Sequence, residues 1–422
     1  MKTFKKVLAF MLCFVLMFSF AACASDETSD DSSSTTDVSD IIVGFIFLHD
    51  ENSTYDLNFI NAAEEACDAL GIPEENRIYK TNIDESEDCY EAAVDLVDQG
   101  CTFIFADSFG HEDYIIEAAQ EYPDVQFCHA TGTKSHTEGL DNYHNAFASI
   151  YEGRYLAGIA AGMKLNEMIE DGEITEDEAK VGYVGAYTYA EVISGYTSFF
   201  LGVRSVCESA TMEVTFTGSW YDETAEKEAA TKLISNGCVL ISQHADSMGA
   251  PTACEDAGVP NVSYNGSTIS ACPNTYIISS RIDWAPYLEY AIQCVIDGEE
   301  IDDDWTGTLS TGSVVLTDLN EDVAAEGTQE AIDEAMAELE AGTLNVFDTS
   351  TFTVTVTDDT NTNATVDENG YLTSYMADVD TDADYIADTE AVSDGIFLES
   401  TYRSAPYFDV QIDGIDLLDT AF

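Results

Sequence analysis

Basic side chains are scarce in this sequence, and their scarcity limits what the protein can bind. The 422 residues include 14 Lys and Arg, six His and 81 Asp and Glu, which gives a formal net charge of -67 at pH 7. Nucleic acids and anionic lipid headgroups bind to clusters of positive side chains. The sequence therefore argues against both partners, and it favours a neutral or cationic small molecule over a phosphorylated one.

Recognisable catalytic motifs are also missing. The sequence has no G-x-S-x-G, no H-E-x-x-H, no Walker G-x-x-x-x-G-K and no dinucleotide-binding glycine pattern. His129 and His244 have carboxylates nearby in sequence but no nucleophile at a recognised spacing, so a hydrogen-bonded polar role is favoured over a catalytic one. Four alternating Asp at 378–384 lack the Gly and the final Glu of a calcium loop. We predict that the protein is not an enzyme.

The cysteines form neither a metal-site pattern nor a complete disulfide framework. Eleven Cys are present and no C-x-x-C pair occurs. Cys13 and Cys23 belong to the N-terminal segment described next, which leaves an odd number, and most of the others lie in apolar strand or helix patterns. Cys in such a pattern acts as a small hydrophobic side chain. We predict no bound metal and no cofactor.

The N-terminus has the pattern of a bacterial export signal. Three Lys within the first six residues precede an apolar run at 7–20. This run is shorter than the ~20 residues that span a bilayer, and small residues close it. Residues 20–23, Phe-Ala-Ala-Cys, look like a lipobox, which implies lipidation of Cys23 and stable anchoring by two acyl chains. The alternative is an ordinary signal peptide, cut at Ala22 to release a soluble protein.

Length and composition divide the chain into several parts. Residues 23–40 are rich in Ser, Thr and Asp, which predicts a disordered tether. The remainder is longer than the ~250–300 residues at which a single core stops growing. We predict a signal peptide at 1–22, a tether at 23–40, lobe one at 41–140 and 266–300, lobe two at 141–265 and 301–345, and a C-terminal extension at 346–422.

Strand and helix patterns alternate between residue 41 and the extension. A β-branched and aromatic run at 41–47 precedes an amphipathic stretch at 57–70, and similar pairs follow. This alternation predicts parallel α/β units. In the extension, 351–357 alternates like a strand, and the turn signal at 367–370 predicts a hairpin with 371–376 pairing back. The predicted fold is two doubly wound α/β lobes around a cleft, with a β-rich extension.

Aromatic and polar side chains gather where the predicted strands end. Ligands bind beyond the carboxyl ends of strands in open parallel sheets. For a single loop the simpler interpretation is a local role, as with Asp222, which could cap the helix that begins at residue 223. The recurrence of rings beside amides and carboxylates favours a site for a flat heteroaromatic molecule. The loops concerned are 107–110, 128–132, 186–191, 218–222, 243–247 and 264–266.

Five short blocks carry a resemblance to a known family. They are Asp-Ser-Phe-Gly at 107–110, Phe-Cys-His-Ala-Thr-Gly at 127–132, Tyr-Glu-Gly-Arg-Tyr-Leu-Ala-Gly at 151–158, Ser-Trp-Tyr-Asp at 219–222 and Gln-His-Ala-Asp-Ser at 243–247. With these blocks, roughly residues 41–344 resemble the basic membrane protein family, which includes the PnrA-like lipoproteins of purine-type ABC importers. The resemblance implies a type I periplasmic-binding fold and a purine nucleoside or nucleobase held between the lobes.

The resemblance also implies roles for individual residues. The first loop of this family usually reads Gly-Trp-Thr-Tyr, where this chain has Asn-Ser-Thr-Tyr at 52–55, so Tyr55 or Phe109 would supply one stacking face. Trp220 matches an aromatic residue that closes the other face. Trp284 lies where other members have a cationic or aromatic wall. Nucleoside-binding members have an Asp at a further position, where this chain has Asn265.

We hypothesise that a purine stacks between rings from both lobes while Asp246, Asn265 and Glu191 bind its edges. The expected partners are this ligand and the permease and ATPase of an importer, with the protein a monomer anchored by lipid on the outer face of the cell membrane. The rival hypotheses are a sensor or surface receptor for another ligand, such as riboflavin, and an enzyme such as a nucleoside hydrolase. The predicted ligand-binding residues are Tyr55, Asn58, Phe109, His129, Glu191, Trp220, Asp222, Asp246, Asn265 and Trp284.

Overall fold

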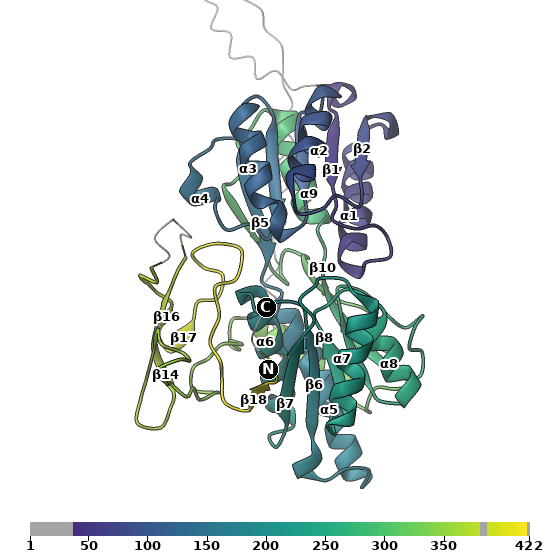
Figure 1. Cartoon of the computed structure of the whole chain (residues 1–422), viewed down its shortest axis with the longest axis vertical. Coiled ribbons are helices and arrows are strands. Elements are labelled where there is room, and N and C mark those ends of the chain that lie inside the picture. Colours follow the sequence, from purple (N-terminus) through teal and green to yellow (C-terminus); the bar gives the residue numbers. More distant parts are fainter. Residues whose placement is uncertain (1–36, 380–385, 420–422) are drawn as a thin grey trace, which may run out of the picture. The chain divides into compact units, whose positions relative to one another are not determined.

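The computed structural model describes residues 37–379 and 386–419 (Figure 1). The predicted signal peptide, the lipidation site Cys23 and most of the tether lie outside the described residues. So do three of the four alternating acidic residues, at 380, 382 and 384. Within the described ranges, none of the helices combines the length and apolarity that a membrane span requires.

The first sheet of the described chain has six strands, all parallel, in the order β11-β5-β4-β3-β1-β2. Its strands are β1 (Val43–Ile46), β2 (Arg77–Lys80), β3 (Phe103–Ala106), β4 (Gln126–Ala130), β5 (Tyr143–Ala148) and β11 (Asp304–Gly307). Helices α1 (Thr54–Leu70) and α9 (Ala285–Asp297) cover one face, and α2 (Glu87–Asp98) and α3 (Glu112–Glu121) cover the other. Both faces are therefore buried, as parallel sheets require. We call this sheet and its helices the first half.

The second sheet has seven strands within the described residues, in the order β12-β10-β9-β8-β6-β7-β18. They are β6 (Lys180–Gly185), β7 (Thr211–Phe216), β8 (Leu240–Gln243), β9 (Asn261–Tyr264), β10 (Tyr276–Ile282), β12 (Val314–Leu316) and β18 (Ile415–Leu417). Helices α5 (Tyr151–Glu170) and α6 (Ala190–Val206) cover one face, and α7 (Glu223–Ser235) and α8 (Gly249–Ala257) the other. Helix α10 (Thr328–Glu340) packs on α5. This sheet and its helices form the second half.

Short helical segments complete the two halves. They are the helix α4 (Ser135–Glu138) and the 3-10 turns η1 (Val38–Asp40), η2 (Glu74–Asn76), η3 (Phe109–His111) and η4 (Glu176–Glu178). Most elements from 41 to 300 lie where the sequence patterns predict them, because each combines a clear hydrophobic period with a stop signal. Helix α1, for example, begins after Ser53, whose side chain accepts from the backbone N–H of Asp56, and ends at Gly71 with φ 74°.

The chain crosses between the halves at 149–150, 283–284 and 308–313, and these crossings differ from the predicted lobe boundaries. Strand β5 lies in the first sheet although it was predicted within lobe two, and β10 lies in the second sheet although it was predicted within lobe one. Strand β11 returns to the first sheet. A short apolar run marks a strand, but which sheet it joins depends on pairing with residues distant in sequence, which periodicity does not reveal.

Helices α5 and α6 touch through glycine. A Cβ atom built on Gly158 would lie 2.1 Å from the carbonyl oxygen of Phe199, and one on Gly202 would lie 2.0 Å from that of Tyr155. Only a residue without a side chain allows so close an approach of two backbones. The last glycine of the Glu-Gly-Arg-Tyr-Leu-Ala-Gly block is therefore explained by helix packing.

The C-terminal extension, described at residues 346–379 and 386–419, contains short antiparallel strands. They are β13 (Ala364–Val366), β14 (Leu372–Ala377), β15 (Thr389–Glu390), β16 (Val392–Ser393) and β17 (Ile396–Phe397). The turn at 367–370 joins β13 to β14, so the predicted pairing partner at 351–357 was wrong, apart from a single bridge between Thr353 and Tyr371. The hydroxyls of Thr353 and Thr355 instead donate to Asp413, at 2.7 and 2.8 Å. Side-chain contacts with the chain end thus replace a strand ladder.

The extension shares a hydrophobic core with the second half. Phe347 and Phe408 stack with ring centroids 4.3 Å apart. Both belong to the apolar cluster formed by side chains of α5, α6 and the strands that these helices cover. Strand β18 joins the edge of the second sheet beside β7. The extension is therefore packed into the second half and places its irregular segments beside the site described next.

Candidate functional site

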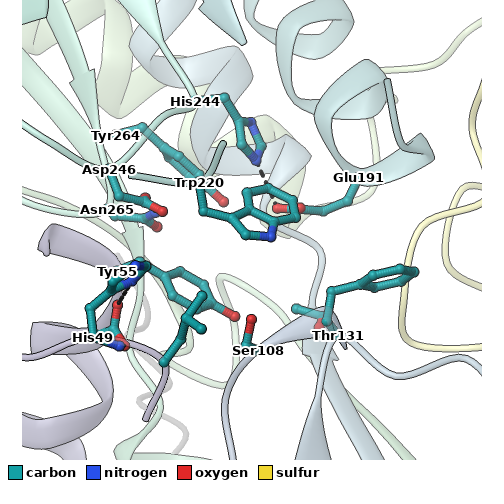
Figure 2. Close-up of a pocket in the computed structure, with 13 residues that line it drawn as sticks. His49, Tyr55, Ser108, Thr131, Glu191, Trp220, His244, Asp246, Tyr264 and Asn265 are labelled. Atoms are coloured by element: carbon teal, nitrogen blue, oxygen red, sulfur yellow. Dashed lines mark hydrogen bonds and ion pairs between the residues drawn. The ribbon is translucent and has the colours of Figure 1, made fainter. Parts of the chain in front are cut away.

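A pocket lies between the two sheets, at the carboxyl ends of their strands, and contains about 400 Å³ of space that is partly open to solvent (Figure 2). Such a position is where α/β sheets bind ligands, because loops and helix N-termini converge there. The first wall, from the first half, consists of Leu48, His49, Tyr55, Asp56, Ser108, Phe109 and Thr131. The second wall, from the second half, consists of Glu191, Trp220, His244, Asp246, Tyr264 and Asn265.

The structure brings six of the ten predicted binding residues together in this pocket: Tyr55, Phe109, Glu191, Trp220, Asp246 and Asn265. The other four do not line it. Asn58 donates from Nδ2 to the carbonyl oxygen of Asn265, at 2.5 Å, and His129 is fully buried with Nε2 2.7 Å from the carbonyl oxygen of Ser108. Ligand binding by the ten residues remains a prediction.

Asp222 and Trp284 have local roles in the structure. The Asp222 carboxylate caps α7 by accepting from the backbone N–H of Ala225, at 2.9 Å. The Trp284 ring lies in the core of the first half, 4.5 Å from that of Phe59 and nearly parallel to it. Burial of this ring explains why Trp284 does not reach the pocket.

Sequence reasoning overlooked His49 and Asp56 on the first wall. Both follow β1, whose carboxyl end opens on the pocket like those of β3 and β4. The signal was present, because the rule that finds polar residues after strands applies equally to residues 48–56.

Asp246 is the most deeply buried carboxyl group on the second wall. Its side chain accepts a hydrogen bond from Nδ2 of Asn265, at 2.8 Å, and the residue is 4% exposed. Burial raises the pKa of Asp246 well above its usual value, and the Asp56, Glu226 and Glu191 carboxylates raise it further. A ligand N–H that donates to Asp246 would stabilise its charged form in this environment.

Glu191 is supported by a chain of polar groups that leads to a buried arginine. Its Oε1 lies 3.0 Å from Nε2 of His244, and Nδ1 of His244 lies 3.3 Å from the hydroxyl of Tyr183. Arg154 donates to the same hydroxyl, at 2.9 Å. The guanidinium is fully buried among the rings of Tyr183, Phe199 and Tyr264. Arg154 therefore positions the second wall from behind and does not line the pocket.

The first wall is largely satisfied by its own hydrogen bonds. Burial acts to raise the pKa of Asp56, but hydrogen bonds from His49 and Ser53 outweigh it, so the pKa is lowered. Those donors are the backbone N–H of His49 and the hydroxyl of Ser53, each at 2.6 Å. The hydroxyl of Tyr55 donates to the carbonyl oxygen of Asp107, at 2.7 Å. This wall thus offers the pocket rings and small hydroxyls, with fewer uncommitted polar atoms.

Aromatic rings cluster beside the pocket. The ring of Trp220 meets that of Tyr187 edge to face, with centroids 5.0 Å apart, and Tyr187 stacks on Tyr189 at 5.2 Å. Tyr189 also contacts Phe109 of the first wall, at 5.0 Å. Rings from both halves thus meet at one side of the pocket, which is an arrangement that can hold a flat molecule by stacking.

Two residues of the lining have left-handed backbone conformations. Thr131 has φ 67° and Asn265 has φ 63°. Asn tolerates this region, whereas a β-branched residue such as Thr adopts it rarely and at a cost of about 1–3 kcal/mol. Strained residues of this kind concentrate at ligand sites, which agrees with the position of Thr131 on the first wall.

The two halves touch directly beside the pocket. The hydroxyl of Thr54, on α1, donates to the carbonyl oxygen of Asp246, at 3.1 Å. The bond from Asn58 to Asn265 also joins the halves. The structure therefore joins the halves by hydrogen bonds from α1 to the backbone of Asp246 and Asn265. Among the described residues, no group of three or more His, Cys, Asp and Glu is arranged to hold a metal ion.

Comparisons with known proteins agree with this geometry. Residues 45–341 match the family model described as ABC transporter substrate-binding protein PnrA-like. A purine-binding protein of Brucella abortus is 31% identical over 312 residues, which are 72% of this chain and 82% of the relative. A putative ABC transporter glucose-binding protein of Haloferax volcanii is 34% identical over 223 residues, 53% of each chain.

A solved structure shows the same fold. It is an ABC transporter solute-binding protein from Aeropyrum pernix, with a TM-score of 0.62 and 18% identity over 76% of this chain and 94% of that one. The predicted fold class of two α/β lobes with a C-terminal β-rich extension is confirmed. The family match ends before the extension begins.

Proposed function

Because this chain belongs to the PnrA-like family of ABC transporter substrate-binding proteins, we propose that it captures a purine nucleobase or nucleoside in the pocket between its halves. The membership also confirms the family resemblance that the sequence blocks carry. Support for the purine comes from the Brucella relative, which is described as purine-binding, and from the chemistry of the pocket.

The observation that carries the proposal is the pairing of rings with edge-binding groups in one pocket. Trp220 on the second wall and Tyr55 on the first provide aromatic surface, and Asp246 and Asn265 point into the space between them (Figure 2). A purine has two flat faces and a rim of N–H donors and ring-nitrogen acceptors. Stacking would hold its faces, while a carboxylate and an amide would bind its rim.

Glu191 supplies a second acceptor at the other side of the pocket. Its side chain is 18% exposed, so it remains accessible to a ligand while His244 holds it in place. It would accept from an exocyclic amino group or from a sugar hydroxyl. A strongly acidic protein disfavours phosphorylated ligands, so nucleosides and bases are preferred to nucleotides.

The proposal extends to delivery and location. The lipobox-like sequence at 20–23 supports lipidation of Cys23 and attachment of a monomeric protein to the outer face of the cell membrane, where it would pass the ligand to a permease driven by an ATPase. Substitution Cys23→Ala should move the protein from the membrane fraction to the medium. Retention of the variant in the membrane fraction would contradict the anchor.

A neutral sugar is a second candidate ligand. The Haloferax relative is described as a putative glucose-binding protein, and carboxylates beside a Trp ring also suit a sugar, whose hydroxyls donate and whose C–H face stacks. The pocket favours the purine because aromatic side chains approach it from both walls.

A thermal-shift screen tests the proposed function. The purified protein would be heated with adenine, adenosine, guanosine, cytidine, riboflavin or glucose, since a ligand that binds only the folded state raises the melting temperature. We expect purines to raise it and Trp220→Ala to abolish the shift. The matched control is Tyr371→Ala, an exposed ring of the extension, which should keep the shift. A rise with glucose alone would replace the purine by a sugar.

A further inference from the structure

A second chamber adjoins the pocket on the side of the C-terminal extension. It encloses about 830 Å³ of space that is partly open to solvent. Phe109, Thr131, Glu191 and Trp220 line both spaces, so the two lie next to each other. The rest of the chamber wall consists of Thr133, Thr188, Tyr189 and Ala190 from the two halves, and of Arg403, Ala405, Pro406 and Asp409 from the extension.

The extension is fixed to both halves at this chamber. The backbone N–H of Ser404 donates to Oδ2 of Asp304 on β11 of the first half, at 2.9 Å. The buried side chain of Glu399, also in the extension, accepts from the hydroxyl of Ser194 on α6 of the second half, at 2.5 Å. These contacts hold residues 399–409 beside Glu191, where Figure 2 shows the pale yellow ribbon of the extension. Hydrogen bonds to both halves thus hold the chamber wall in place.

Arg403 shapes this wall and does not offer a free positive charge. Its guanidinium donates to the carbonyl oxygens of Val379, Ala405 and Pro406, at 2.9 to 3.1 Å, and the residue is 7% exposed. Each of its three nitrogens therefore donates to a backbone carbonyl. A phosphate would find no strong partner here, beside two carboxylates.

The other side chains of the chamber wall fit a neutral polyhydroxy substituent. Glu191 provides carboxyl oxygens, and so does Asp409, whose Oδ1 also accepts from the hydroxyl of Tyr375. Threonine side chains lie along the chamber, and the rings of Trp220 and Tyr189 provide flat surface. Carboxylates accept from sugar hydroxyls, and rings pack against the C–H face of a sugar. The chamber and the pocket share Glu191 and Trp220, so a group attached to a base in the pocket would lie toward the chamber.

We propose that residues 403–409 of the extension form a specificity wall, which receives the glycosyl part of a nucleoside whose base occupies the pocket. This inference rests on the proposed purine function and deepens it, because it states which part of the ligand each space binds. Residues 403–409 lie beyond the family-matched region, so this contribution to the site comes from the chain's own extension. The protein should accordingly prefer a nucleoside to its free base.

Calorimetric titration with adenine and adenosine, with inosine as a second nucleoside, tests the wall. In Ala405→Phe the added ring projects from the wall into the chamber, so affinity for adenosine should fall about tenfold or more while affinity for adenine changes by less than about threefold. The matched control is Ala364→Phe, the same change in β13 of the extension and outside the chamber lining. The control should bind both ligands as the wild type does.

Asp409→Asn provides a variant of unchanged size in case Ala405→Phe does not fold. Replacing the carboxyl by an amide should weaken adenosine about three- to tenfold and leave adenine unchanged. Equal losses for base and nucleoside, or no loss for the nucleoside in either variant, would overturn the inference. Wild-type protein that binds adenine but not adenosine would also overturn it and leave the proposed function standing. Wild-type protein that binds neither adenine nor a nucleoside would contradict both this inference and the proposed function.

Discussion

The two walls of the pocket are built in different ways. On the first wall, Asp56 in the first turn of α1 is held by donors from the preceding loop and its pKa is lowered, and the hydroxyl of Tyr55 is committed to a carbonyl. On the second wall, burial raises the pKa of Asp246, and Glu191 keeps part of its side chain exposed. The second wall therefore has acceptors that a ligand would stabilise, while the first has already satisfied its own.

This difference assigns the walls different tasks. We expect the second wall to determine which ligand binds, since its carboxyl groups gain most from a donor. The first wall would cover the ligand with rings and small hydroxyls, while Thr54 and Asn58 of α1 join the two halves beside it. Substitutions on the second wall should thus change affinity and selectivity more than equivalent substitutions on the first.

The largest expected effect is that of Trp220→Ala. Stacking of a base on an aromatic side chain is worth about 1–3 kcal/mol, so affinity for adenosine should fall by up to ~100-fold. Phe109→Ala on the first wall is the matched change, and because Phe109 is 37% exposed it should cost less than ~10-fold. Calorimetry would measure both. Equal losses of affinity for the two variants would contradict the larger contribution expected of the second wall.

Asp246→Asn should reduce affinity about tenfold, because it removes the charge from an acceptor of the ligand's N–H groups. It should also change the pH dependence. The pKa of Asp246 is raised, and a donor binds the ionised form, so wild-type affinity should increase with pH until the carboxyl is fully ionised. The variant should show no such increase. Ser108→Ala on the first wall is the control, and a larger loss there would contradict the assignment.

Glu399→Gln tests how the extension is attached to the second half, which carries the second wall of the pocket. Burial raises the pKa of Glu399 from 4.5 to about 7. Its contribution to stability is therefore fully present below pH 4.5 and is lost as the pH rises through 7. The variant should melt a few degrees above the wild type at pH 8 and close to it at pH 4.5. A difference that does not depend on pH would show that the carboxyl does not titrate in this range.

The smallest expected effect on binding is that of Tyr55→Phe. The hydroxyl already donates to the carbonyl oxygen of Asp107, so its loss should change ligand affinity by less than about threefold while lowering stability by about 1 kcal/mol. Thermal melting and calorimetry on the same sample would separate the two. A tenfold loss of affinity with unchanged stability would mean that Tyr55 binds the ligand directly and that the first wall also selects it.

Part of this site could be predicted because strand ends are local in sequence. Trp220 and Asp246 follow strands whose apolar runs stop abruptly, and the structure places both in the pocket. Trp284 was placed by family position, but its ring is buried against Phe59, and sequence alone does not tell which side of a loop faces the core. Asp56 was overlooked although it follows β1 in the same way.

The fold was predictable to the same extent. Helices and strands followed their hydrophobic periods, whereas the sheet that β5, β10 and β11 join depends on long-range pairing. The chamber wall at 403–409 could not be predicted at all. That segment has neither helical nor strand periodicity, and its place beside Glu191 follows from contacts with residues ~100 to 200 positions away, such as Asp304 and Ser194.

The central claim is that this pocket selects a purine. Calorimetric titration of the purified wild-type protein with adenosine, and separately with glucose, tests it most directly. The account predicts saturable binding of adenosine to one site per chain and no heat of binding with glucose. Saturable binding of glucose with no response to adenosine, adenine or guanosine would contradict it.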